Sequence, residues 1–246
     1  METAEYALMD VVEDRMWWYR AVHARVLDAL ARRPGDPSRP VLDAGCGTGG
    51  LLRRLGERYG DRRLLVGVEY FEPAARRARA KSGAAVAVGD VHALPFPDGA
   101  FGAVLSVDVL CHRLIEPERG LAEMRRVLAP GGTLVLNLPA FEWLKSAHDR
   151  RVHNARRTTL RAARAQLAEA GFARIEARYW NALLLPLMVV QRKLLAAREE
   201  AASDVAPYPP WLDRTLHGVT ELERRLAALG LRYPAGGSVL LVATRP

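Results

Sequence analysis

The sequence predicts an α/β fold built on a doubly wound sheet, and two observations support this prediction. Short apolar runs alternate with stretches of helical periodicity along most of the chain, the order that returns each strand to the same sheet. A glycine-rich turn, Gly45–Gly50, joins the first apolar run to a helix, where such sheets bind ligands. We expect strands at 41–43, 64–68, 84–88, 101–107, 133–138, 172–180 and 237–244, and helices at 51–59, 73–81, 118–128 and 159–170.

Residues 4–31 are predicted to form one or two helices, because apolar and aromatic side chains recur at helical spacing. Within them, an aromatic group stands beside Arg20: Trp17, Trp18 and Tyr19. One interpretation is a helix that its tryptophans fasten to the body of the protein. The other is a lid over a ligand, with Arg20 gripping a carboxylate. Residues 1–36 are assigned to this N-terminal helical lid, which ends where prolines and glycine break the chain.

The first strand ends in Asp43, and the glycines after it allow a sharp turn and a close approach of ligand to backbone amides. The pattern also matches the dinucleotide fingerprint G-x-G-x-x-G. In a dinucleotide site a pyrophosphate rests on this turn and on the following helix N-terminus, and Asp43 would repel it. A ligand with a positive end and no phosphate fits better. S-adenosylmethionine, which carries an ammonium and a sulfonium, is such a ligand.

Two further acids follow the second and third strands. Glu69 lies about 20 residues after the glycines, where an acid accepts both ribose hydroxyls in nicotinamide and S-adenosylmethionine sites. Asp90 can accept from an exocyclic adenine amine, with Val91 offering a backbone donor and an apolar contact. Acids at three successive strand tips favour a nucleoside with a cationic tail over a phosphorylated one.

Composition narrows the classes of protein and partner. Half of the 246 residues are hydrophobic, and the formal net charge is +8. A basic surface can attract nucleic acid, an anionic membrane or acidic substrates, but no tight basic run is interleaved with aromatic residues, so we do not expect nucleic acid. The two cysteines, Cys46 and Cys111, lack metal-type spacing. With no signal-peptide core and no run long enough to span a membrane, we expect a cytoplasmic protein.

The combination of these features resembles the class I S-adenosylmethionine-dependent methyltransferases, close to the methyltransferase type 11 group. The residues that carry the resemblance are 41–49, 69, 89–90, 94–96, 101–112, 123–132 and 171–172. The resemblance implies a Rossmann-like, seven-stranded sheet, mostly parallel with the last strand antiparallel, with helices on both faces. It also implies S-adenosylmethionine as cofactor and S-adenosylhomocysteine as product.

By the same resemblance, residues around the strand tips hold the cofactor. Asp43, Gly45 and Gly47 are expected around its methionine part, and Glu69 at the ribose. Asp90 and Val91 are expected at the adenine, and Ser106 and Asp108 along the methyl-transfer pocket. The expected cofactor site also includes Tyr19, Arg20, Cys46 and Tyr70.

Methyl transfer from a sulfonium is an in-line displacement with an activated donor, so positioning supplies much of the acceleration. A general base is needed only when the acceptor is a hydroxyl, a protonated amine or a carbon acid. Candidates for this chemistry are His148, Asp149 and His153, in the irregular stretch 139–160 expected to cover the pocket. We hypothesise that His148 is the base; the alternative is that it hydrogen-bonds within the lid. No metal is expected, because no ligand spacing matches a known site.

The acceptor side is less sharply defined. Residues expected to contact the acceptor are Trp18, His112, Phe141, Tyr179 and Asn181. A second substrate-side insertion is assigned to 182–218. Its apolar run, 182–190, has three interpretations. It is part of the core, it is a homodimer interface, or it is an apolar acceptor site or an interfacial helix that makes peripheral membrane contact. Residues 196–218 are expected to form a loop or a short helix over one face.

The sequence thus indicates a single domain, 1–246, that methylates a small-molecule or lipid-like acceptor. Three alternatives stay open. One is a nicotinamide-dependent oxidoreductase, which the glycine pattern allows and Asp43 and Asp90 disfavour. Another is a nucleic-acid methyltransferase, which would call for a basic groove or an added module. The last is a binding protein that kept the pocket but lost catalysis.

Overall fold

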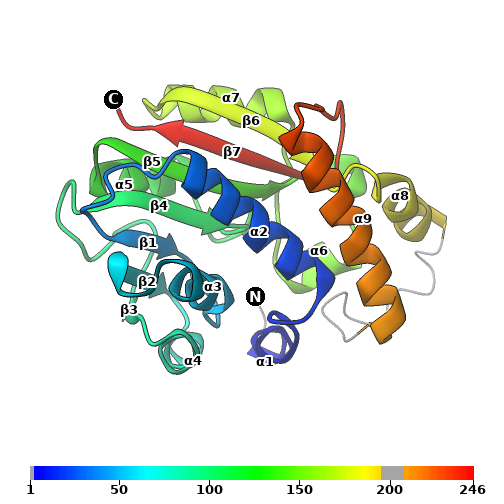
Figure 1. Cartoon of the computed structure of the whole chain (residues 1–246), viewed down its shortest axis with the longest axis horizontal. Helices are drawn as coiled ribbons and strands as arrows, with labels where there is room; N and C mark the ends of the chain where they lie inside the picture. Colours follow the sequence, from blue (N-terminus) through cyan, green and yellow to red (C-terminus); the bar gives the residue numbers. More distant parts are fainter. Residues whose placement is uncertain (1–2, 195–207) are drawn as a thin grey trace.

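The structure is a computed structural model that describes residues 3–194 and 208–246, apart from the side chains of residues 3, 4, 147, 148 and 192–194. Its centre is a seven-stranded sheet in the order β3-β2-β1-β4-β5-β7-β6 (Figure 1). The strands are β1 Val41–Ala44, β2 Leu65–Glu69, β3 Ala85–Val88, β4 Phe101–Val107, β5 Leu128–Pro139, β6 Ala173–Trp180 and β7 Ser238–Thr244. The predicted fold class is confirmed.

Strand direction brings the predicted acids to one edge of the sheet. β1 pairs in parallel with both β2 and β4, so that Asp43 lies opposite Gly67 on one side and Leu105 on the other. β7 runs antiparallel to β5 and to β6. The carboxyl ends of β1, β2 and β4 therefore meet at the same edge, where doubly wound sheets bind ligands.

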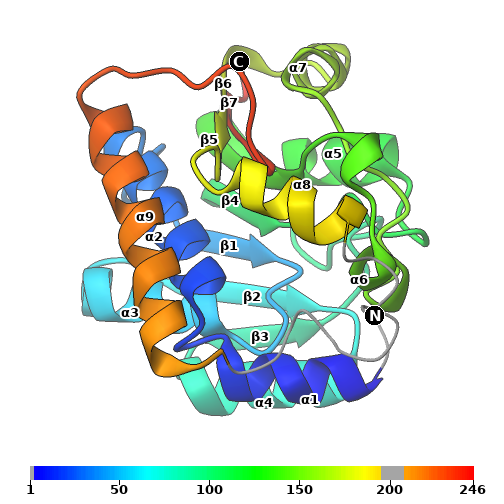
Figure 2. The ribbon, with the colours of Figure 1, turned by 90° about the vertical axis from the view of Figure 1, so that its right-hand side faces the viewer.

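Helices cover both faces of this sheet (Figures 1 and 2). The longer ones are α1 Thr3–Val12, α2 Trp17–Arg32, α3 Gly50–Tyr59, α4 Glu72–Ser82, α5 Pro117–Val127, α7 Leu160–Glu169, α8 Leu185–Leu194 and α9 Pro210–Ala228. Shorter turns are η1 Gly60–Arg62, η2 Glu142–Leu144 and α6 Ala147–Arg151. Within the described residues, no helix is both long and apolar enough to cross a membrane.

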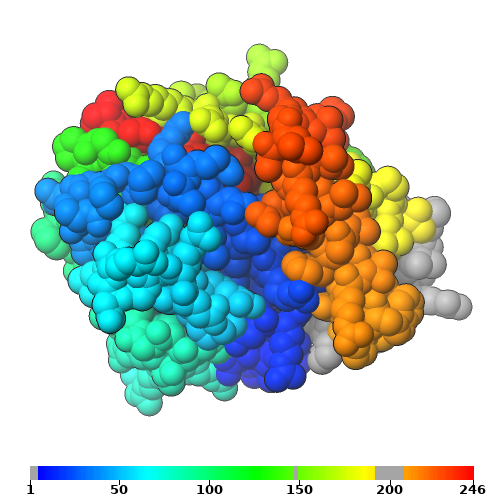
Figure 3. All heavy atoms as spheres, in the orientation of Figure 1, coloured from blue at the N-terminus to red at the C-terminus, as the bar shows by residue number. Residues whose placement is uncertain are grey.

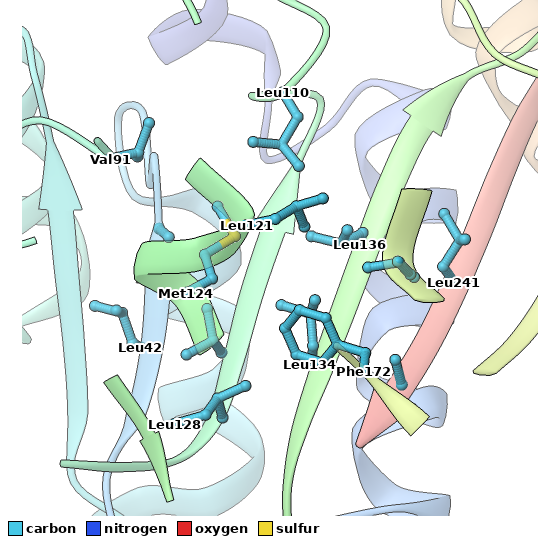
Figure 4. Close-up of a cluster of buried hydrophobic side chains, with 14 of the residues drawn as sticks. Leu42, Val91, Leu110, Leu121, Met124, Leu128, Leu134, Leu136, Phe172 and Leu241 are labelled. Carbon is cyan, nitrogen blue, oxygen red and sulfur yellow. The ribbon is translucent and has the colours of Figure 1, made fainter. Parts of the chain in front are cut away.

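The core has two layers, one on each face of the sheet. On one face, Leu121 and Met124 of α5 pack with Leu42 and Leu136 of the strands (Figure 4). On the other, Val22 and Val26 of α2 pack with Leu52 and Leu55 of α3. Because both faces are covered, the central strands read as continuous apolar runs, which made them predictable from sequence.

Two segments differ from the expectation. Residues 129–132, outside the strand expected at 133–138, lie within β5, where Gly131 and Gly132 exchange backbone hydrogen bonds with Arg245 near the end of β7. Residues 210–218, expected as a loop or a short helix, begin the 19-residue helix α9. Three prolines suggested a loop, but Pro210 stands at the start of the helix, where its missing N–H costs nothing. The rest of that expectation, 196–207, lies outside the described residues.

α9 lies alongside α2 on the surface (Figure 3) and fixes the position of the chain after β6. The buried Glu223 pairs with Arg25 at 3.3 Å. The same carboxylate accepts hydrogen bonds from the backbone N–H groups of Asn181, Ala182 and Leu183. The middle of α2 and the segment before α8 are therefore tied together through one side chain.

Candidate functional site: a cavity over the glycine turn

A cavity of about 360 Å³ lies at the carboxyl ends of β1, β2 and β4. α1 and the first turn of α2 form one wall, and Asn181 with Met188 of α8 contribute to another. Several sequence-predicted residues line it: Trp18, Tyr19, Gly45, Gly47, Glu69, Tyr70, Val91, Asp108, His112 and Asn181. The fold therefore brings residues that were predicted for the cofactor and residues that were predicted for the acceptor to one cavity.

The glycine turn forms the floor of this cavity. Its backbone adopts conformations that favour glycine. Gly45, Gly47 and Gly49 have φ values of 83°, 55° and 93°. A Cβ on Gly45 would lie 2.3 Å from the Val109 side chain, so a larger residue does not fit there. At Gly47 the nearest atom would be the Met9 methyl of α1, at 2.7 Å. The turn is thus approached closely from above by α1.

α1 is fastened over the turn by charges. The buried Glu13 accepts from the Thr48 hydroxyl at 2.5 Å and pairs with Lys81 of α4. Lys81 also pairs with Asp10 at 2.7 Å. These contacts confirm that the N-terminal segment lies over the predicted ligand edge. Its role as a lid is a proposal.

Glu69 stands at the tip of β2 with both carboxylate oxygens engaged. One accepts from the Tyr6 hydroxyl at 2.9 Å and from the Phe71 N–H at 3.0 Å. The other accepts from the Gly47 N–H at 2.9 Å. All three donors are neutral, so the negative charge of Glu69 is not neutralised by these contacts. Burial, and then the charge of Glu69, raise the pKa of Tyr6, so its hydroxyl stays a donor.

Asp43 lies beneath the turn, 2% exposed, and does not itself line the cavity. Burial, and then the charges of Glu69 and Glu13, raise the pKa of its carboxyl to about 8. No cation among the described residues opposes this shift. A positive charge placed over the turn would stabilise the ionised form.

Asp108 lies just after β4 and lines the cavity. Its backbone φ is 53°, in the left-handed region that costs an ordinary residue free energy. The Asn137 amide donates to its Oδ1 at 2.8 Å, and Trp180 donates to the Asn137 oxygen at 2.8 Å. Burial raises the pKa of Asp108 to about 7, against the opposing effects of Asn137 and Arg157.

Sequence reasoning missed Asn137 and Trp180. Asn137 is fully buried inside an apolar strand. A polar side chain in such a run must be hydrogen-bonded, which is the signal that could have found it.

Besides Asp43, four of the predicted cofactor residues do not line the cavity. The Ser106 hydroxyl donates to the Ala44 carbonyl at 2.8 Å, and Cys46 is buried in the core. Asp90 accepts from the His92 backbone at 2.9 Å and contacts its ring at 2.8 Å. Arg20 pairs with Asp213 of α9 at 3.3 Å. The Arg20 side chain therefore engages a protein carboxylate.

Two of the three catalytic candidates of the 139–160 segment, Asp149 and His153, do not line the cavity either. Asp149 is fully buried and pairs with Arg157 at 2.8 Å, while accepting from the Ser146 N–H at 2.8 Å. These contacts hold the segment together, because a buried guanidinium and carboxylate satisfy each other. His153 follows α6 with φ 57°, and its carbonyl accepts from Arg113. The His148 side chain lies outside the described residues.

Of the predicted acceptor residues, Phe141 and Tyr179 lie away from the cavity. Their rings stack with centroids 5.2 Å apart, and the Tyr179 hydroxyl accepts from the Leu160 N–H at 3.0 Å. They fasten the segment after β5 to β6. His112 does line the cavity, and burial lowers its pKa to about 4, so the ring is neutral at neutral pH. No group of metal-ligating side chains occurs in the described part of the chain.

Comparison with known proteins gives one family. Residues 42–136 match the family described as "Methyltransferase domain". A malonyl-[acyl-carrier protein] O-methyltransferase from Geobacter sulfurreducens is 34% identical over 173 residues, which are 64% of this chain and 64% of that protein. A demethylmenaquinone methyltransferase from Thermus thermophilus is 37% identical over 134 residues, 52% of this chain and 56% of that protein. The chain thus spans less than two thirds of the length of these curated relatives.

Solved structures share the fold over nearly the whole chain. A S-adenosylmethionine-dependent methyltransferase from Thermotoga maritima superposes with a TM-score of 0.59 at 21% identity, covering 98% of this chain and 100% of the other. At that identity the likeness shows the fold alone. The matched sequence block, 42–136, contains the glycine turn, Glu69 and Asp108.

Proposed function

The chain belongs to the class I S-adenosylmethionine-dependent methyltransferases, and from this we propose that it transfers a methyl group to a small-molecule or lipid-like acceptor by in-line displacement. The whole chain, 1–246, would act as one domain. Its lid would be 1–36, and its acceptor side would be formed by 139–160 and by the described parts of 182–218.

One observation carries the proposal above all: the carboxylates of Asp43 and Glu69 flank the glycine turn without a basic partner. Burial, and then the charges of Glu69 and Glu13, raise the pKa of Asp43, and Glu69 takes hydrogen bonds from neutral donors. A pyrophosphate over this turn would meet the charge of Glu69 and would raise the pKa of Asp43 further. A sulfonium and an ammonium would instead be stabilised by Glu69 and would favour the ionised form of Asp43. This disfavours the nicotinamide alternative.

The residues present fit S-adenosylmethionine. Gly45 and Gly47 offer bare backbone against its methionine part, and Glu69 would accept its ribose hydroxyls. Val91 and Tyr70 would border the adenine, and Tyr19 and Asp108 the methyl-transfer region. When bound, the cofactor supplies an activated methyl group. The chain's own residues would orient the acceptor and exclude water, and this positioning would accelerate methyl transfer.

The acceptor is proposed to be small or lipid-like for two reasons. The cavity, about 360 Å³ in volume, lies between α1, α2 and α8, and this size suits a small group. The names of two relatives, a malonyl-[acyl-carrier protein] O-methyltransferase and a demethylmenaquinone methyltransferase, support this class of acceptor. On α8, Leu187 and Val190 are about half exposed. This supports an apolar approach to the cavity, with peripheral membrane contact or a second copy as occupants to be tested.

Isothermal titration calorimetry with S-adenosylhomocysteine and NAD⁺ tests the proposal. We expect the first to bind with a micromolar or lower dissociation constant and the second not to bind. Asp43→Asn and Glu69→Gln should each weaken S-adenosylhomocysteine binding by at least about tenfold, a loss of about 1.4 kcal/mol. Preferential binding of NAD⁺ would refute the assignment.

A further inference from the structure

The cavity is negative although the chain as a whole is positive. Its lining carries the carboxylates of Glu5, Glu69 and Asp108. The cation among the described lining residues is Arg157, and its guanidinium is held by Asp149 at 2.8 Å and by the Ala140 carbonyl at 3.1 Å. His112 adds no charge, because its lowered pKa keeps it neutral. The net charge of +8 therefore resides elsewhere.

Asp108 is the carboxylate best placed to meet an acceptor. Its Oδ1 is occupied by Asn137, whose amide orientation is fixed by Trp180. No described residue donates to its Oδ2. The neighbours that face it are the neutral Asn137 and Cys111 and the charged pair Arg157 and Asp149. Because the pair largely cancels, the charge of Asp108 is not neutralised.

Aromatic rings line the same cavity. Trp18 and Tyr19 pack edge to face with centroids 5.1 Å apart. Burial, and then the charges of Glu13, Asp108 and Glu5, raise the pKa of the Tyr19 hydroxyl, and Tyr19 and Asp108 line the same cavity. A carboxylate beside aromatic faces is a combination that attracts organic cations, and it repels anions.

We propose that the acceptor is an amine with at least one N–H, which enters as an ammonium ion and is held by Asp108 against Trp18 and Tyr19. This rests on the proposed function and narrows it to N-methylation. Carboxylate and phosphate acceptors are disfavoured, because no cation in the described lining is available to receive them.

The chemical step balances with Asp108 as the proton acceptor. The bound ammonium gives one proton to Oδ2 of Asp108, which frees the nitrogen lone pair. The nitrogen then forms the N–C bond to the methyl group as the C–S bond breaks and sulfur keeps the electron pair. The methylated ammonium leaves, and Asp108 releases its proton to solvent, so that one proton is released per turnover.

A matched set of probes tests the proposal. They are 2-phenylethylamine, 2-phenylethanol and 3-phenylpropionate, which share a ring and a short chain and differ in end group. Each is titrated by calorimetry into the protein, with and without saturating S-adenosylhomocysteine, at up to about 10 mM. We expect the amine to bind at least about tenfold more tightly than the alcohol, and the carboxylate not to bind.

Two variants locate the charge. Asp108→Asn keeps the acceptor oxygen for Asn137 but removes the charge, and it should reduce amine binding to the level of the alcohol. Asp61→Asn removes one surface charge from η1 and should leave all three probes unchanged. Equal binding of amine and alcohol, a preference for the carboxylate, or no amine binding overturns the proposal. If S-adenosylhomocysteine fails to bind while the amine binds, the proposed function fails and the amine site stands.

Discussion

Asn137 donates from its amide nitrogen to Asp108 and accepts from the Trp180 indole at its oxygen, both at 2.8 Å. The indole has no other role than donor, so the amide can take only one orientation. β4, β5 and β6 are thereby linked at their carboxyl ends by one fully buried side chain. The carboxylate of Asp108 is held at the cavity by a neutral partner, which positions it without cancelling its charge.

Trp180→Phe should destabilise the protein through this link. It leaves the buried oxygen of Asn137 without a donor, at a cost of about 1–3 kcal/mol. For a chain of this size that lowers the melting temperature by about 2–4 °C per kcal/mol, measurable by circular dichroism. The control is Trp143→Phe, whose ring is half exposed and should change stability by less than about 0.5 kcal/mol. Equal melting temperatures for both variants would show that the link is not stabilising.

Asp43 should make the ligand-free protein less stable as pH rises. With a folded pKa of about 8 and an unfolded pKa near 4, the folded chain holds a proton that the unfolded chain has lost. Stability therefore falls between about pH 4 and about pH 8, by up to about 1.4 kcal/mol per pH unit. Asp108, with a pKa of about 7, acts in the same direction. The lowered pKa values of His23, about 3, and His112, about 4, act oppositely, but only below about pH 6.5.

Asp43→Asn should therefore flatten the fall of melting temperature from about pH 6.5 to about pH 8 and raise stability at the upper end. The same variant should bind S-adenosylhomocysteine less well. Saturating S-adenosylmethionine should also flatten the slope in the unaltered chain, since its cation favours the ionised carboxylate. An unchanged slope in the variant would mean that Asp43 is ionised in the ligand-free protein.

Tyr6→Phe should strengthen cofactor binding. The Tyr6 hydroxyl occupies the Glu69 oxygen that also accepts from Phe71, so a ribose hydroxyl would have to displace it. Removing this hydrogen bond, worth about 1 kcal/mol, should increase the affinity for S-adenosylhomocysteine about fivefold and lower ligand-free stability by a similar free energy. Calorimetry and thermal unfolding measure the two effects. Weaker binding would instead indicate that the hydroxyl contacts the ligand.

The parts of the site that sequence predicted are those encoded locally. The glycine turn, Glu69 and Asp108 follow strands whose apolar runs are unambiguous, and all but Asp43 and Cys46 of the expected tip residues at β1 and β2 meet the cavity. Asp90 and Arg20 were assigned to the site because of their charge, and the structure pairs both with other residues of the chain. Arg20 engages Asp213, a partner distant in the sequence, and Asp90 engages its near neighbour His92. In both cases another residue of the chain competes with a ligand for the same charge. Because of its prolines, 210–218 was expected as a loop or a short helix, and the full length of the 210–228 helix was not predicted.

Asp149 shows why the segment after β5 could not be interpreted from sequence. A histidine-aspartate stretch suggests catalysis, yet the carboxylate meets Arg157 eight residues later, at 2.8 Å and with side-chain exposures of 0% and 5%. Arg157→Ala should cost about 3–5 kcal/mol, because it leaves a buried charge unpaired. The double variant Arg157→Met with Asp149→Leu should recover much of that loss, since both charges are removed together. Urea unfolding of the three proteins measures this. A base role for Asp149 would appear otherwise: Asp149→Asn would abolish methyl transfer while leaving stability unchanged.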